Sequence, residues 1–177
     1  MAMAAPEVPI EVDPETGIWR TDGLPMIYLP RHFLVNIQKS VEEAIGADRF
    51  RDIMYGSADL SALQWCRAEA KTHGLTPIET FRHYLKRLSQ RGYGRFEITA
   101  LDQAAGTAAV TVRHSAYALA YGQVGRPVCY MFEGSFGGAM RFVMEQAGRQ
   151  AEPNCREFAC AAHGASECRF ELRCDPV

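Results

Sequence analysis

Five of the six cysteines of this chain lie between residues 129 and 174. Within this stretch, Glu157 stands three positions before Cys160, and Cys168 follows eight positions later. Soft thiolates with a carboxylate beside them are typical ligands of tetrahedral Zn²⁺ sites. A metal bound there would hold the C-terminal elements together, so this cluster constrains the fold more than any other part of the sequence.

The segments 152–160 and 167–174 are expected to form a final β-hairpin. Pairing of these two strands would bring Cys160 and Cys168 together near the mouth of the hairpin, with Glu157 close by on the first strand. The pattern therefore predicts three zinc ligands on a single hairpin, and a fourth ligand must come from elsewhere in the chain.

Cys129, at the start of a glycine-rich helix, is the best candidate for the fourth ligand. Because four protein ligands leave no position for water, the predicted zinc is structural rather than catalytic. Cys155, His163 and Cys174 remain rival ligands. Free cysteines can also pack simply as small apolar side chains, which is the alternative explanation of the cluster.

The remaining chain predicts helices first and antiparallel strands later. A hairpin is expected around Asp22-Gly23, and Thr76-Pro77-Ile78-Glu79 is a clear helix start. Expected helices cover 30–45, 47–71 (kinked or divided at Gly56-Ser57), 76–90 and 127–147, and expected strands cover 95–101 and 108–113. This order is typical of an α+β fold with helices packed on an antiparallel sheet. We expect residues 1–29 to form an extension and residues 30–177 a single ligand-binding domain.

The chain has 19 basic and 21 acidic residues, a net charge of −2, without a run of like charge. This composition gives no reason to expect direct contact with nucleic acid. No stretch of 18 apolar residues predicts a membrane span, and the first residues lack the features of a signal peptide. We therefore expect a cytoplasmic protein, in which the cysteines remain reduced or bind metal.

The predicted helix 127–147 contains Gly134, Gly137 and Gly138. Interior glycines destabilise a helix by about 1 kcal/mol each relative to alanine, so they indicate either close helix packing or room for a ligand. A small apolar ligand needs a dry cavity with a few polar groups. The candidate ligand-binding residues are aromatic, apolar or histidine side chains near this helix: Trp65, His83, Tyr117, Tyr121, Tyr130, Phe132, Phe136 and Met140. For each of them, ordinary core packing is the alternative.

The C-terminal motifs resemble those of the 4-vinyl-reductase domain family. They comprise Cys129-Tyr130, the spaced glycines Gly134 and Gly138, Glu157-Phe-Ala-Cys160, Gly164, and Cys168-Arg-Phe170. The family is similar in fold to TRAPP subunits and includes hydrocarbon-binding proteins and the sensor domains of phenol-responsive bacterial regulators. The resemblance implies a structural zinc on Cys129, Glu157, Cys160 and Cys168 beside an effector pocket, and often a homodimer.

The sequence shows none of the phosphate-loop, nucleophile-elbow or dinucleotide-binding motifs of common enzyme classes. We therefore expect a binding or sensor module for a small hydrophobic or aromatic molecule rather than an enzyme. Two alternatives stay open. The family name suggests an enzyme or accessory protein of (bacterio)chlorophyll or tetrapyrrole metabolism, and the TRAPP-like architecture permits a pure interaction subunit.

Overall fold

The computed structural model describes residues 7–176, so residues 1–6 of the expected extension and Val177 lie outside it. The helices and strands occur in the following order: β1 (Glu11–Val12), β2 (Trp19–Thr21), β3 (Leu24–Met26), α1 (Arg31–Ile45), α2 (Ala47–His73), α3 (Pro77–Gln90), β4 (Arg95–Asp102), β5 (Thr107–Arg113), α4 (Ala116–Tyr121), α5 (Tyr130–Gln146), β6 (Ala151–Ala159), the 3₁₀ turn η1 (Ala161–His163) and β7 (Cys168–Pro176). In the described part of the chain, no helix has both the length and the apolar character needed to cross a membrane.

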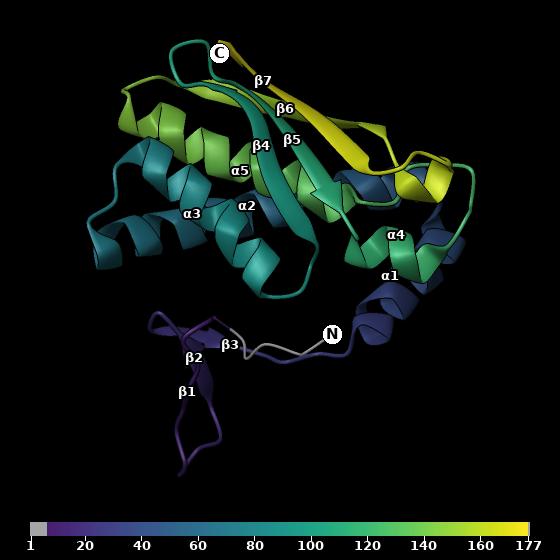
Figure 1. Ribbon diagram of the computed structural model, residues 1–177, viewed down its shortest axis with the longest axis horizontal. Helices are drawn as coiled ribbons and strands as arrows, with labels where there is room; N and C mark the ends of the chain where they lie inside the picture. Colours follow the sequence, from purple (N-terminus) through teal and green to yellow (C-terminus); the bar gives the residue numbers. More distant parts are fainter. Residues whose placement is uncertain (1–6, 177) are drawn as a thin grey trace.

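Four strands form an antiparallel sheet in the order β4-β5-β7-β6, and helices α5, α2 and α3 lie beneath one face of it (Figure 1). Along β7, buried Cys168, Phe170 and Leu172 alternate with exposed residues. This period of two gives the sheet one face toward the helices and one toward solvent. The predicted α+β class, with helices on an antiparallel sheet, is confirmed.

Helix α3 begins where local sequence chemistry requires it. The backbone N–H of Thr76 donates to Oε2 of Glu79 at 2.9 Å, and the Thr76 side chain receives a bond from the N3 backbone in return. Pro77 occupies the first turn, where its missing N–H costs nothing. The predicted helix start is therefore confirmed.

Two helical features differ from the sequence prediction. Helix α2 continues through Gly56, so the expected division at Gly56-Ser57 is wrong, and the helix ends only at Gly74 in the left-handed conformation (φ 62°). Packing against α5 along its length supplies more stabilisation than one exposed glycine removes. Helix α4 was not predicted; its short segment starts at Ser115, whose side chain accepts the N–H of Ala118 at 3.3 Å.

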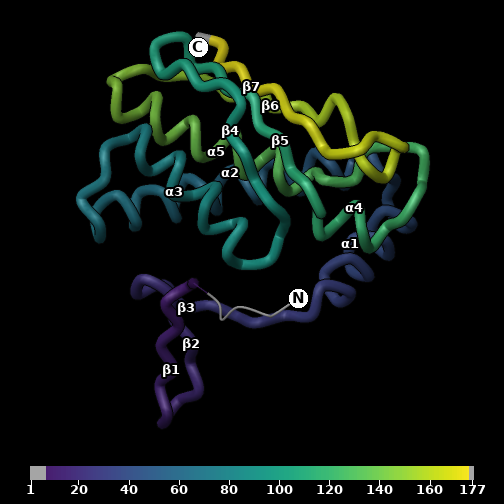
Figure 2. Tube along the Cα trace, viewed as in Figure 1, coloured from purple at the N-terminus to yellow at the C-terminus, as the bar shows by residue number. Residues whose placement is uncertain are grey.

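The N-terminal strands β1, β2 and β3 form a separate small antiparallel sheet, which extends away from the main body (Figure 2). Asp22 and Gly23 form the turn between β2 and β3, both with positive φ (53° and 78°), as a tight hairpin turn requires. The predicted hairpin is confirmed. The connection from β3 to α1 and the first turns of α1 expose several apolar side chains: Ile27, Tyr28, Leu29, Phe33 and Ile37.

The glycines of α5 allow its backbone to approach the backbone of α2. A Cβ at Gly134 would collide with the carbonyl oxygen of Tyr55, and a Cβ at Gly138 with that of Asp59. Close helix packing, rather than room for a ligand, is therefore what these two glycines provide. The structure gives Gly56 on α2 no such neighbour.

We predict that Gly138→Ala lowers the free energy of unfolding by about 1–3 kcal/mol, because the added methyl group would force α2 and α5 apart. Gly56→Ala is the matched control, and should leave stability unchanged or raise it by up to about 1 kcal/mol through helix propensity. Urea denaturation of both variants measures the difference. Equal stabilities would contradict the packing role of Gly138.

Candidate functional site

The four predicted metal ligands converge in the structure. One ligand atom each from Cys129, Glu157, Cys160 and Cys168 lies within 4.8 Å of the others, and all four residues are buried. The Sγ atoms of Cys129 and Cys168 are 3.7 Å apart, and those of Cys168 and Cys160 are 3.9 Å apart. Tetrahedral zinc with Zn–S bonds of 2.3 Å places sulfurs about 3.8 Å apart, so this spacing suits the ion.

The local structure of the β6–β7 hairpin explains why Glu157, Cys160 and Cys168 lie close together. The pairing of β6 with β7 is interrupted by an irregularity between Glu157 and Ala159, and η1 then closes the turn. The N–H groups of His163 and Ala165 both donate to the carbonyl of Cys160, at 2.9 and 3.1 Å. This tight turn brings Cys160 back toward Cys168 at the start of β7, as the spacing predicted.

Helix α5 brings the fourth ligand, because Cys129 is its N-cap. The N–H of Cys129 donates to Oε2 of Glu157 at 3.1 Å. The other oxygen, Oε1, is buried and has no hydrogen-bond partner within residues 7–176. A buried carboxylate oxygen without a partner is costly. A divalent cation would satisfy it, so the donor set fits zinc.

Burial and mutual contact shift the acidities of these groups. Burial, reinforced by the adjacent Cys160 thiolate, raises the pKa of Glu157 to about 8. Hydrogen bonds from Cys129 and Cys168 lower the pKa of Cys160, whereas burial raises the pKa of Cys129. The acidities of the four side chains therefore depend on one another.

The rival ligands lie outside this group of atoms. Cys155 and Cys174 are buried in β6 and β7, and His163 is exposed on η1. Sequence reasoning missed two supporting residues. Ser115 places its Oγ 3.2 Å from Sγ of Cys129, and Glu133 accepts the N–H of Glu157 at 2.7 Å. An acidic residue inside the apolar glycine-rich helix was the available signal for Glu133.

The predicted ligand-binding residues fall into three places. Three of them make ring contacts between α4, α5 and the sheet, namely Tyr117, Phe132 and Phe136, and Met140 of α5 is buried in the same core. The ring centre of Phe132 is 5.4 Å from that of Tyr117 and 5.0 Å from that of Phe96 on β4. These edge-to-face contacts, with those that Phe132 and Phe136 make to Phe170 of β7, form an aromatic cluster against the sheet.

Trp65 and His83 stack between α2 and α3, with ring centres 5.6 Å apart. The indole nitrogen of Trp65 is buried and has no hydrogen-bond partner in the described part of the chain. Tyr121 and Tyr130 lie at a third place, where both contact Arg126. The structure therefore does not join all eight residues into one surface.

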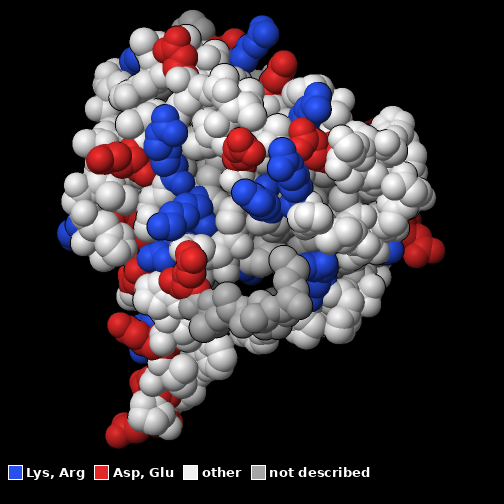
Figure 3. Space-filling model, in the orientation of Figure 1, with Lys and Arg blue, Asp and Glu red and all other residues white. Residues whose placement is uncertain are grey.

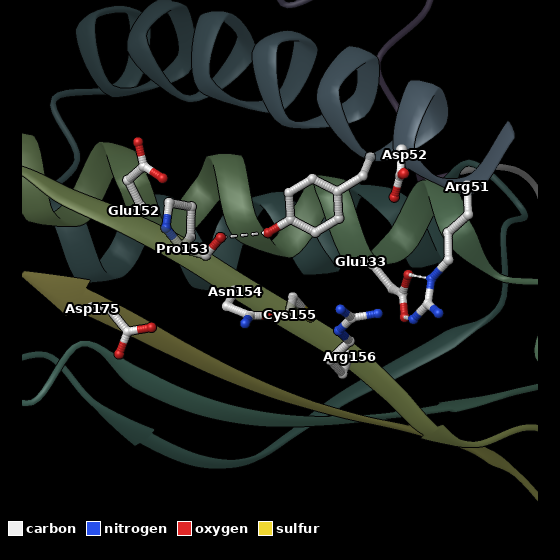
Figure 4. Close-up of a pocket in the computed structure, with 10 residues that line it drawn as sticks. Arg51, Asp52, Glu133, Glu152, Pro153, Asn154, Cys155, Arg156 and Asp175 are labelled. Carbon is white, nitrogen blue, oxygen red and sulfur yellow. Dashed lines mark hydrogen bonds and ion pairs between the residues drawn. The ribbon is translucent and has the colours of Figure 1, made fainter. Parts of the chain in front are cut away.

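A groove lined mostly by charged and polar residues lies elsewhere, between α2 and β6 (Figure 4). Its volume is about 560 Å³. Arg51 faces Glu133 across it, with Nε donating to Oε2 at 2.7 Å, and the hydroxyl of Tyr55 donates to the carbonyl of Pro153 at 2.6 Å. None of the eight predicted ligand-binding residues lines this groove. Its charged walls are unlike the apolar pocket that the sequence suggested.

A family described as a domain of unknown function, DUF5943, matches residues 4–99. The match spans more than half of the chain, so the chain belongs to this family. It includes the N-terminal hairpin and helices α1–α3 and ends before the metal ligands. No curated protein matches the sequence.

Two solved structures are similar in fold. The phenol-responsive sensory domain of the transcription activator PoxR, solved with phenol, has a TM-score of 0.79 at 20% identity, over 93% of this chain and 84% of that one. Trafficking protein particle complex subunit 3 from Naegleria fowleri, covalently bound to palmitic acid, has a TM-score of 0.55 at 10% identity, over 82% and 95%. At these identities the likeness establishes the fold.

We predict that Cys160→Ser/Cys168→Ser removes one equivalent of zinc and lowers Tm. At free zinc one thousand times Kd the ion would contribute about 4 kcal/mol, which corresponds to roughly 8–16 °C for a chain of this size. Elemental analysis and thermal melts measure both effects. Cys174→Ser is the control and should keep its zinc; equal loss in both variants would contradict the ligand set.

We also predict that zinc affinity rises with pH around neutrality. The carboxyl of Glu157, with its pKa of about 8, and the thiol of Cys129 must lose protons when the ion binds. Each displaced proton increases affinity by about tenfold per pH unit. Calorimetry in buffers of different ionisation enthalpy counts the released protons, and a pH-independent affinity would show that these groups do not bind the metal.

Proposed function

We propose that this protein is a binding or sensor module for a small hydrophobic or aromatic molecule, built around a structural zinc ion. The observation that carries the proposal is the likeness of almost the whole chain to the phenol-responsive domain of PoxR. The converging cysteines and glutamate support it, as does the resemblance to the 4-vinyl-reductase family. The module would work in the cytoplasm, where thiolates stay available to metal.

The aromatic cluster is the proposed binding region. Tyr117, Phe132, Phe136 and Met140 supply an apolar wall, and a planar ligand would bind by opening or replacing contacts between their side chains. In the described structure these side chains pack against one another in the buried core. Binding would therefore shift the population toward an open form, which is a reasonable basis for sensing.

Trp65, which belongs to the same buried core as the aromatic cluster, provides a polar contact for the ligand under this proposal. Its indole N–H is buried without an acceptor, and the guanidinium of Arg91 lies 5.2 Å from its ring with Nε and one terminal nitrogen also unpartnered within residues 7–176. Buried donors of this kind favour a ligand that carries an oxygen acceptor. We therefore infer that an oxygen-bearing aromatic molecule binds better than its hydrocarbon analogue.

The zinc ion would position the binding region without taking part in chemistry. Cys129 begins α5, which carries Phe132 and Phe136, and contacts Ser115, which begins α4 with Tyr117. One ion held by Cys129, Glu157, Cys160 and Cys168 would therefore fix both helices to the sheet.

A second copy of this chain is the proposed partner. The exposed apolar residues Ile27, Tyr28, Leu29, Phe33 and Ile37 follow one another along the connection into α1 and its first two turns. Apolar side chains gathered in this way mark association surfaces more often than free surface. The face in Figure 3 carries both basic and acidic side chains.

The TRAPP-like fold supports one alternative, a pure interaction subunit. In that case the same exposed apolar residues would bind a different protein, and the aromatic cluster would be ordinary core. Ligand-dependent stability separates the two functions.

We predict that phenol raises the Tm of the zinc-loaded protein more than toluene does. At one hundred times Kd a ligand adds about 2.7 kcal/mol. Trp65→Phe should weaken phenol binding by about fivefold, because one hydrogen bond contributes about 1 kcal/mol. Trp19→Phe, at the exposed tryptophan of β2, is the control. No stabilisation by either compound, or by related phenols, would favour the interaction subunit.

A further inference from the structure

A second group of metal-binding side chains lies where the N-terminal hairpin meets the helices. Asp22, Glu69, His73 and His83 each direct one carboxylate oxygen or imidazole nitrogen to a common point, and these four atoms lie within 4.8 Å of one another. They come from three separate segments, the β2–β3 turn, the last two turns of α2, and α3. None of them belongs to the cysteine site.

The distances match side chains that face one position. Nε2 of His83 is 2.9 Å from Oε2 of Glu69, and Nε2 of His73 is 3.3 Å from the same oxygen. Nε2 of His73 is also 3.3 Å from Oδ1 of Asp22. Glu69 and His73 stand four residues apart on α2, so both project from the same face of the helix.

Glu69 gives the independent indication of a ligand. Its side chain is completely buried, and its Oε1 has no hydrogen-bond partner among the described residues. Both imidazole nitrogens contact the other oxygen, Oε2, so the buried carboxylate is satisfied on one side only. A divalent cation at the common point would compensate the charge of Glu69.

Neighbouring residues hold the ligands in place, as they do around known metal sites. Arg87 binds the carboxylate of Asp22, with its Nη2 2.8 Å from Oδ2 and 3.1 Å from Oδ1. The ring of Trp65 stacks on that of His83 at an interplanar angle of 18° and so fixes its orientation. The side chain of His73 is 35% exposed, which gives an ion a path from solvent.

We propose that Asp22, Glu69, His73 and His83 form a second metal site, for a divalent transition metal ion of the Zn²⁺ type. Two imidazoles and two carboxylates make a harder donor set than the three thiolates of the first site, so the two sites differ in metal preference. The ion links the β2–β3 turn to α2 and α3. It thereby cross-links Asp22 to His83 and attaches the N-terminal hairpin to the rest of the protein.

Cobalt titration of the full chain tests this site separately from the cysteine site, because thiolate ligation produces a charge-transfer absorption that imidazole and carboxylate ligation lacks. Wild-type protein should bind two equivalents of Co²⁺. His73→Gln/His83→Gln should bind one and keep the charge-transfer band. Cys160→Ser/Cys168→Ser should also bind one, without that band.

His32→Gln, at an exposed histidine on α1, is the matched control and should bind two equivalents. Hydrogen exchange gives a second measurement: metal should protect amides of residues 19–26 in wild-type protein and not in His73→Gln, a change at a partly exposed position. The proposal is overturned if the double histidine variant still binds two equivalents, or if wild-type protein binds only the ion that produces the charge-transfer band. It does not depend on the proposed ligand-sensing function.

Discussion

The close approach of α5 to α2 is the contact on which the rest of this structure depends. Helix α5 lies between α2 and the sheet, and it has buried side chains on every face. Gly134 and Gly138 permit the backbone contact with α2, while Phe132 and Phe136 face the aromatic cluster on the other side. This placement also brings Cys129, the N-cap of α5, into contact with Glu157 of β6 and Cys168 of β7. A shift of α5 by one turn would separate Cys129 from the other three ligands by about 5 Å.

The buried residues include Glu133, Glu157 and Glu69, and the structure compensates their carboxylates in different ways. Glu133 is compensated by Arg51 and by the N–H of Glu157. Glu157 and Glu69 are different, since each is buried and keeps one oxygen without a hydrogen-bond partner in the described chain. Both unpaired oxygens belong to groups of side chains with the geometry of metal ligands. The same physical requirement, compensation of a carboxylate away from water, thus applies on two sides of the domain.

The convergence of Cys129, Glu157, Cys160 and Cys168 could be predicted from sequence because three of them lie on one hairpin, where spacing and strand pairing decide which residues meet. The mutual placement of the proposed ligand-binding residues could not be predicted as well. The rings of Tyr117, Phe132 and Phe136 do contact one another, whereas Trp65 stacks on His83, and Tyr121 and Tyr130 both contact Arg126. An aromatic residue in a sequence indicates burial, but the helix against which it packs depends on contacts between distant segments.

The sequence by itself determined the elements whose causes are local. Thr76, Pro77 and Glu79 specify the start of α3, and Asp22-Gly23 specifies a hairpin turn, because the interacting atoms are at most a few residues apart. Only the tertiary structure decided that α2 runs unbroken through Gly56, that the glycines of α5 serve helix packing, and that Asp22 meets His83. These outcomes depend on burial and on charge compensation between segments far apart in the chain, and no local pattern of residues encodes that proximity.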